Sequence, residues 1–291
     1  MTLGKANATP HVVDVHLATF TQTGPRESNQ DRVGGFVTRV GGHAAVVLAV
    51  ADGIGGLDGG EEAASLAIDA VARLATLDLP SCPERSEAVA ARLVRSFRRA
   101  SEAIHDWSEA HPARGPAGST LTCAVVWRRR YLVAHAGDTR CYFLGPRGAC
   151  SLTEDHTEAA RLARAGHLPP GLAAASPLRH RLTNALGWPR QTWVDVVPGP
   201  AAAGELDDGD ALLLCSDGVH DVLGEADFAD ATLGTSDPGA AVQRLVRMAL
   251  ARGTRDNASI ALLRVGPGSA ASPRGLTRSV PAHKLADGAI V

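Results

Sequence analysis

The 291-residue sequence lacks several features that would place it in a class at once. Its N-terminus leads into no long apolar segment, and no run approaches the roughly 18 apolar residues that a membrane helix needs. A net charge of -2 gives no overall attraction to nucleic acid or to an anionic membrane. We therefore expect a cytoplasmic protein without a secretory signal or a membrane anchor, which binds neither membrane nor nucleic acid.

Cysteine is also scarce. The five cysteines are odd in number and contain no Cys-x-x-Cys pair, which argues against a disulfide framework and against a structural zinc site. Their surroundings in the sequence are mostly apolar. We expect reduced, buried thiols.

The apolar pattern predicts mainly short strands. They are expected at 12–20, 33–37, 44–51, 119–127, 131–136, 139–144, 193–197, 211–216 and 259–265. Helical periodicity predicts helices at 60–75 and 86–109, and a third helix that begins at Pro238 and ends at Gly253. Strands and helices do not alternate strictly, so we predict an α+β fold rather than a doubly wound parallel sheet. We interpret the arginines on the outer face of 86–109 as solvated surface rather than as a nucleic-acid groove.

The chain is long enough for one large domain, which we place at 11–265 after a flexible N-terminus at 1–10. Within the domain, 156–182 begins as a short helical piece and continues with prolines and small residues, which predicts an exposed flap. From 266 to 291 the sequence has little that would form a core. We predict a disordered tail there, and a short partner-binding segment within it stays open.

Aspartates recur at the ends of the predicted elements. Apolar runs lead directly into Asp52 and Asp217, and Asp31, Asp138 and Asp256 stand at other element ends. Each one alone is typical of a turn. If they converge at the rim of the core, two like charges about 4 Å apart repel by about 4 kcal/mol at an effective dielectric near 20. Such a cluster requires a cation.

The donor atoms indicate which cation. Oxygen donors without histidine or cysteine at zinc spacing favour Mg²⁺ or Mn²⁺. Glycine at position 53 lets the backbone approach such an ion and turn its carbonyl inward. Two ions about 3.5–4 Å apart can share a bridging water and direct it at a phosphorus atom. Hydrolysis of a phosphate ester is the reaction that this arrangement suits best.

Eight motifs carry a resemblance to a known family. They are RESNQD, VADGIGG, GSTLTCAVV, AGDTRCYFL, LTEDHT, LTNALG, CSDGVHD and RDNASIAL, in this order. Their order and spacing resemble those of the type 2C metal-dependent protein serine/threonine phosphatases (PPM family), and most closely the bacterial branch. The resemblance spans residues 12–265.

The resemblance implies a four-layer α-β-β-α sandwich of two mostly antiparallel sheets flanked by helix pairs. The metal centre would lie at one end, between the sheets. Asp52 would bridge two core Mn²⁺ or Mg²⁺ ions, with the Gly53 carbonyl on one ion and Asp217 and Asp256 on the other.

Three further residues receive roles from the resemblance. Asp31 would hold metal-bound water, and Arg26 would bind the substrate phosphate through its planar, permanently charged guanidinium. Asp138 would bind a third, weaker ion together with Asp217. The segment 156–182 corresponds to the variable flap over the site.

The implied activity is hydrolysis of phosphoserine and phosphothreonine in proteins by direct attack of a metal-bridging hydroxide, without a phosphoenzyme. A cognate serine/threonine kinase is the expected partner, and we expect a monomer. The alternative is a non-catalytic, regulatory signalling module of the same fold. The complete set of aspartates and Arg26 argues against this alternative. The sequence names neither the phosphoprotein substrate nor the kinase.

The chain departs from the family pattern at two positions. Gln30 stands where many members have glutamate, and Ile54 stands where eukaryotic members have a histidine that protonates the leaving alcohol. The proton donor is therefore open. His156 is either a structural hydrogen-bonding residue at the base of the flap or a proton donor.

A cysteine-dependent phosphatase is a rival interpretation. Five residues separate Cys141 from Arg147 and Cys123 from Arg129, which is the spacing that such enzymes use. Their mechanism needs backbone N–H groups around the phosphate and a thiol of lowered pKa. The intervening segments are bulky and strand-like, and Pro146 has no N–H. We interpret both spacings as coincidence.

Overall fold

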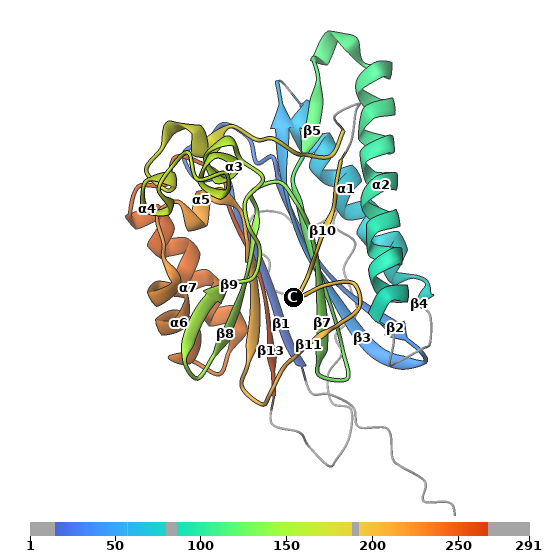
Figure 1. Cartoon of the computed structure of the whole chain (residues 1–291), viewed down its shortest axis with the longest axis vertical. Helices are drawn as coiled ribbons and strands as arrows, with labels where there is room; N and C mark the ends of the chain where they lie inside the picture. Colours follow the sequence, from blue (N-terminus) through green and yellow to red (C-terminus); the bar gives the residue numbers. More distant parts are fainter. Residues whose placement is uncertain (1–14, 57, 80–85, 188–191, 267–291) are drawn as a thin grey trace, which may run out of the picture.

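The computed structural model describes residues 15–56, 58–79, 86–187 and 192–266 (Figure 1). The predicted N-terminal segment 1–10 and nearly all of the predicted tail lie outside the described residues. In the described part, no helix combines the length and the apolar character needed to cross a membrane.

Two sheets form the centre of the molecule. The first sheet is antiparallel throughout and has the strand order β1 (Val15–Gln22), β13 (Ala258–Val265), β12 (Ala211–Cys215), β8 (Arg140–Gly145) and β9 (Gly148–Ser151). The second has the order β10 (Asp195–Val197), β7 (Arg130–Ala136), β6 (Leu121–Trp127), β3 (His43–Gly55), β2 (Asp31–Val40) and β4 (Asp78–Leu79). In addition, β5 (Ala117–Ser119) pairs with β3, and β11 (Gly204–Glu205) pairs with β7. The one parallel pair among these strands is β2 with β4.

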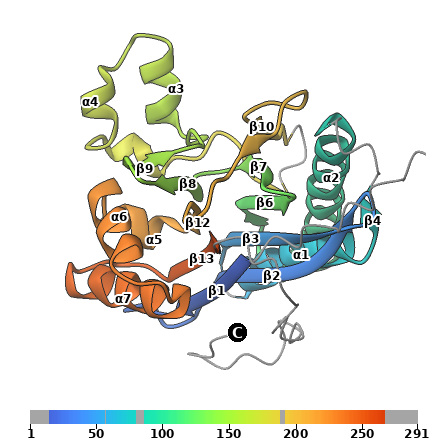
Figure 2. The ribbon, with the colours of Figure 1, turned by 90° about the horizontal axis from the view of Figure 1, so that it is seen from below.

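Helices cover the outer faces of both sheets (Figures 1 and 2). The second sheet carries α1 (Gly59–Ala75) and α2 (Ser86–Ala110), and the first carries α5 (Asp217–His220), α6 (Glu225–Leu233) and α7 (Pro238–Ala251). The predicted four-layer α-β-β-α sandwich is confirmed. Apart from these layers, η1 (Pro112–Arg114) follows α2, and the segment between β9 and β10 contains α3 (Glu158–Arg164), α4 (Pro170–Ala173) and η2 (Pro177–His180).

Alternation along β3 shows how the sequence makes these layers. Val47, Ala49 and Ala51 pack in the cluster under α1 and α2, whereas Leu48 and Val50 pack in the cluster between the two sheets. Since successive side chains of a strand point to opposite faces, an unbroken apolar run buries both faces of β3. This strand therefore lies in the interior of the sandwich and carries its next residues to the end of the core.

The structure corrects three expectations. The strand predicted at 44–51 does not stop before Asp52, because β3 continues to Gly55 through pairing with β2 and β5. The helix α6 and the strand β9 were not predicted. Cys150 is exposed, whereas the other three cysteines of the described part are buried as expected.

Candidate metal centre

The register of β2 and β3 brings the first two aspartates together. Asp31 is the first residue of β2, and its cross-strand partner in β3 is Asp52. The Asp52 backbone N–H donates to the hydroxyl of Thr120 (3.0 Å), and its carbonyl accepts from the Thr120 N–H (2.8 Å). Both carboxylates are thus fixed by backbone pairing at one end of the second sheet.

The other three predicted aspartates come from the facing sheet and from the turn between the sheets. Asp217 begins α5 directly after β12, and Asp256 precedes β13, the strand that pairs with β12. Asp138 stands in the turn between β7 of one sheet and β8 of the other. The five side chains therefore converge at one end of the sandwich, from both sheets.

The charges of these carboxylates act on one another. The pKa of Asp52 is well above its usual value, because the side chain is removed from water and because the charges of four other carboxylates act on it: Asp31, Asp217, Asp138 and Asp256. Burial and then the charge of Asp256 raise the pKa of Asp217 to about 7. Burial and then the charge of Asp217 raise the pKa of Asp138. Without a cation, the cluster therefore favours protonated carboxyls near neutral pH.

Asp31 is the most deeply buried of the five aspartates, with 1% of its surface exposed. Burial raises its pKa to about 6, although hydrogen bonds from Ser259 and Ser216 act in the opposite direction. The Ser216 hydroxyl donates to Asp31 Oδ2 at 2.7 Å and accepts from the Ser259 N–H at 3.1 Å. Ser216 therefore links Asp31 to the facing sheet, a contact that sequence reasoning missed.

Glycines make room for the close approach of backbone segments at this end. A Cβ atom on Gly53 would lie 1.9 Å from the carbonyl oxygen of Gly60 in α1, and a Cβ on Gly218 would lie 2.0 Å from the carbonyl oxygen of Asn257. No side chain fits at either position without displacing backbone. These contacts explain why each Asp is followed by glycine.

Arg26 is an exposed residue whose guanidinium contacts one of the clustered aspartates. Its Nη2 contacts Asp256 Oδ2 at 2.6 Å, and its Nε donates to the Arg255 carbonyl at 2.9 Å. Asn257 holds the segment that carries Arg26, since its amide donates to the carbonyls of Thr23 (2.7 Å) and Ser28 (2.9 Å). Asn257 is a second positioning residue that sequence reasoning missed, although it follows Asp256 directly in the RDN motif.

The residues present fit a divalent cation. Asp217 Oδ1 is buried and has no hydrogen-bond partner among the described residues. An unpartnered buried carboxylate oxygen is costly, and a metal ion would satisfy it. Asp52, Asp217 and Asp256 are not among the three-residue groups of the described part whose ligand atoms all lie within 4.8 Å of one another. Binding of one ion by all three therefore requires these carboxylates to move closer together.

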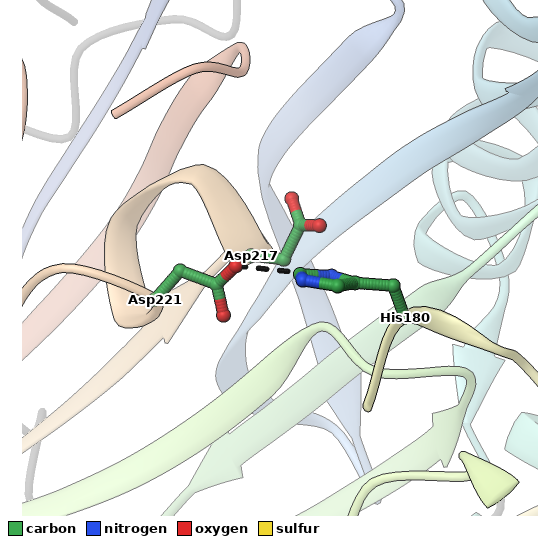
Figure 3. A group of neighbouring side chains, drawn as sticks. All are labelled: His180, Asp217 and Asp221. Atoms are coloured by element: carbon green, nitrogen blue, oxygen red, sulfur yellow. Dashed lines mark ion pairs between the residues drawn. The ribbon is translucent and has the colours of Figure 1, made fainter. Parts of the chain in front are cut away.

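The segment 156–182 reaches the same end of the sandwich. Figure 3 shows His180, from η2, facing Asp221, the residue that follows α5, beside Asp217. One ligand atom of each of these three residues lies within 4.8 Å of the other two. The contacts are 3.9 Å from His180 Nδ1 to Asp221 Oδ2 and 3.2 Å from Arg179 Nη2 to the same oxygen. Asp221 thus links this segment to the end of the sandwich where Asp217 lies.

His156 has structural partners on both ring nitrogens. Nε2 lies 3.0 Å from Asp195 Oδ2, and Nδ1 lies 2.9 Å from the Asn184 amide and 3.1 Å from the Gly137 N–H. It is 3% exposed. These contacts favour the structural interpretation of His156 over that of a proton donor.

The cysteine-dependent interpretation has no support in the structure. Burial raises the pKa of the thiols of Cys123 and Cys141. A buried thiol of raised pKa is the reverse of the exposed, activated thiolate that such a mechanism requires.

Comparison with known proteins identifies the family of this chain. The family model described as "Protein phosphatase 2C" matches residues 25–252. The chain belongs to the protein phosphatase 2C family.

Two relatives and one solved structure illustrate the similarity. The serine/threonine protein phosphatase PstP of Mycobacterium tuberculosis is 32% identical over 216 residues, which are 74% of this chain and 40% of PstP, so the chain spans about two fifths of that relative. The protein phosphatase PhpP of Streptococcus pneumoniae is 27% identical over 250 residues, 86% of this chain and 97% of PhpP. The crystal structure of the PstP catalytic domain with two manganese ions superposes with a TM-score of 0.71 at 28% identity, and the match covers 87% of this chain and 99% of that domain.

Proposed function

We propose that this chain is a Mn²⁺- or Mg²⁺-dependent phosphatase that removes phosphate from phosphoserine and phosphothreonine in proteins and opposes a serine/threonine kinase. The observation that carries the proposal is the convergence of five aspartates at one end of the sandwich, where they raise one another's pKa. Membership of the protein phosphatase 2C family supports the same activity. The solved PstP catalytic domain with two manganese ions supports the choice of metal.

Asp52, Asp217, Asp256 and the Gly53 carbonyl are the proposed ligands of two ions, and Asp138 with Asp217 is the proposed site of a weaker third ion. When bound, two such ions activate a water and offset the negative charge of the phosphate. Asp31, held by Ser216, would accept a hydrogen bond from such a water and orient it.

Arg26 is the proposed phosphate-binding residue. Its guanidinium is fixed beside the cluster by Asp256 and by the Arg255 carbonyl. With Asp256 on a cation, the Arg26 guanidinium would be free to bind two phosphate oxygens. Arg26 would thus exchange its carboxylate partner for the substrate phosphate.

The leaving alcohol requires a proton that the side chain at position 54 cannot give, since Ile54 is apolar. His156 is committed to Asp195 and Asn184. We therefore assign the donor to neither residue.

The test is hydrolysis of an aryl phosphate and of phosphoserine, phosphothreonine and phosphotyrosine peptides, each with Mn²⁺ and with a chelator. We expect metal-dependent hydrolysis with preference for phosphoserine and phosphothreonine. Asp52→Asn should lower kcat by about a thousandfold, which corresponds to about 4 kcal/mol of transition-state stabilisation. Asp106→Asn, on the exposed surface of α2, is the matched control and should retain full activity.

Activity that persists in the chelator, or a near-normal rate in Asp52→Asn, would contradict the proposal. Folded protein without activity toward any of these phosphates would favour the non-catalytic signalling module instead.

A further inference from the structure

The outer surface of the α1 and α2 layer carries a groove that the metal centre does not use. Its volume is about 300 Å³. Apolar residues of α1 and of the turn that follows it form most of its floor: Leu66, Ala70, Leu74 and Leu77. Leu77 is 43% exposed. The groove therefore offers an apolar seat that is open to solvent.

Four arginines surround this seat. Arg73 comes from the last turn of α1, and Arg92, Arg95 and Arg99 come from successive turns of α2. Within the described part of the chain, none of the four forms an ion pair or a side-chain hydrogen bond. By contrast, Arg32 and Arg114, which lie near the same layer, are each paired with a carboxylate. The groove thus concentrates positive charge that the described part of the protein does not neutralise.

The charge of residues 267–291 argues against this segment of the chain as the occupant of the groove. Residues 267–291 contain Arg274, Arg278 and Lys284 against the single acid Asp287. A segment with this excess of positive charge is repelled by four arginines. Residues 267–291 therefore do not suit the groove, and its four arginines favour an occupant with negative charge.

The apolar floor distinguishes among anionic occupants. Arginine forks pair with carboxylates in two parallel hydrogen bonds, and arginine is enriched at protein interfaces. A nucleic-acid backbone offers phosphates to the arginines but no aliphatic group to Leu74 and Leu77. A peptide that carries an apolar side chain among acidic ones satisfies both parts of the groove.

We propose that this groove is a docking site for an acidic segment of a partner protein, with an apolar side chain on the leucine floor and carboxylates on the arginines. The inference goes beyond the proposed phosphatase activity and does not depend on it. Leu74 and Leu77 lie at the end of α1 opposite to Gly60, which contacts the metal centre. At 1.5 Å per residue, about 20 Å of helix separates Leu74 from Gly60, and about 9 Å separates Leu66, at the near end of the groove, from Gly60. Docking here would hold a partner without blocking the catalytic end.

The test uses a fluorescein-labelled peptide of Glu-Glu-Leu repeats and measures its binding to the full chain by fluorescence anisotropy. Arg95→Glu with Arg99→Glu should weaken binding by at least about tenfold, because like charges replace attractive pairs. Leu77→Ser should weaken it several-fold, and added salt should weaken binding to the wild type. All variants should keep the wild-type rate of aryl phosphate hydrolysis.

The matched control is Arg147→Glu with Arg247→Glu, which changes the net charge equally at exposed positions on β8–β9 and α7. This control should bind the peptide like the wild type. Equal loss in the control shows that net charge alone attracts the peptide and overturns the proposal. Absent binding to the wild type, unchanged binding to the Arg95 and Arg99 variant, or tighter binding of a single-stranded oligonucleotide than of the peptide would also overturn it.

Discussion

Replacing Asp217 by asparagine removes one charge from the aspartate cluster. It therefore tests how much the ionised carboxylate destabilises the metal-free protein and how much it contributes to metal binding. In the metal-free protein, burial and the charge of Asp256 raise the pKa of Asp217 from 3.8 to about 7. Between these two values the folded protein keeps a proton that the unfolded chain has released. The contribution of Asp217 to stability therefore falls as the pH rises through this window. Asparagine has the same shape but does not ionise.

The magnitude follows from the size of the shift. From 3.8 to about 7, at 1.36 kcal/mol for each pKa unit, the ionised Asp217 costs the folded protein about 4 kcal/mol. About 3 kcal/mol of this cost develops between pH 5 and pH 8. The advantage of Asp217→Asn over the wild type in free energy of unfolding should therefore grow by about 3 kcal/mol between these two pH values. Buried histidines titrate in both proteins and cancel from the difference.

The assay is urea unfolding at both pH values, first in a chelator and then with Mn²⁺. At a free Mn²⁺ concentration one hundred times its dissociation constant, the wild type should gain about 2.7 kcal/mol, and the variant should gain much less. Asp106→Asn is the control for an exposed aspartate. The reasoning is refuted if the difference between variant and wild type is the same at both pH values, or if Mn²⁺ stabilises both proteins equally.

Three further predictions concern neighbouring residues. Arg26→Ala should raise the KM for a phosphopeptide about tenfold or more with a smaller effect on kcat, since it removes a charged phosphate contact; steady-state kinetics with an unchanged KM would remove this role. Asp221→Ala should free Arg179 and speed amide hydrogen exchange in 157–182 without changing exchange in the sheets, and unchanged exchange would show that the anchor lies elsewhere. Gly218→Ala should lower the free energy of unfolding by about 1–3 kcal/mol, because its Cβ would lie 2.0 Å from the Asn257 carbonyl; wild-type stability in urea would contradict the close approach.

Much of the fold followed from apolar alternation and from the motifs. The strands β6, β7, β8, β12 and β13 lie where continuous apolar runs predicted them, because strands buried on both faces need such runs. The helix α6 was missed because only a few of its residues, among them Phe228 and Ala231, face the core, so its apolar stripe is weak. The end of β3 was missed because strand pairing with β5 outweighs the turn preference of Asp-Gly.

The site was predictable only in part, since sequence order shows which residues are acidic but not which contacts hold them. The convergence of Asp31 and Asp52 depends on the register of β2 and β3. The roles of Ser216 and Asn257 depend on contacts across 185 and 229 residues of sequence. The partnership of Arg26 with Asp256 likewise joins distant segments. The arginine face of α2 was visible in the sequence, but the groove beside it exists only because α1 packs there.

The central claim is that one pocket gathers these aspartates around two hard divalent ions. The most direct measurement is an anomalous difference map from crystals of the protein soaked in manganese. The account predicts two peaks that both touch Asp52, one of them also contacting the Gly53 carbonyl and the other Asp217 and Asp256. Absence of such peaks at full manganese loading, or a manganese ion held by a single one of these aspartates, would contradict it.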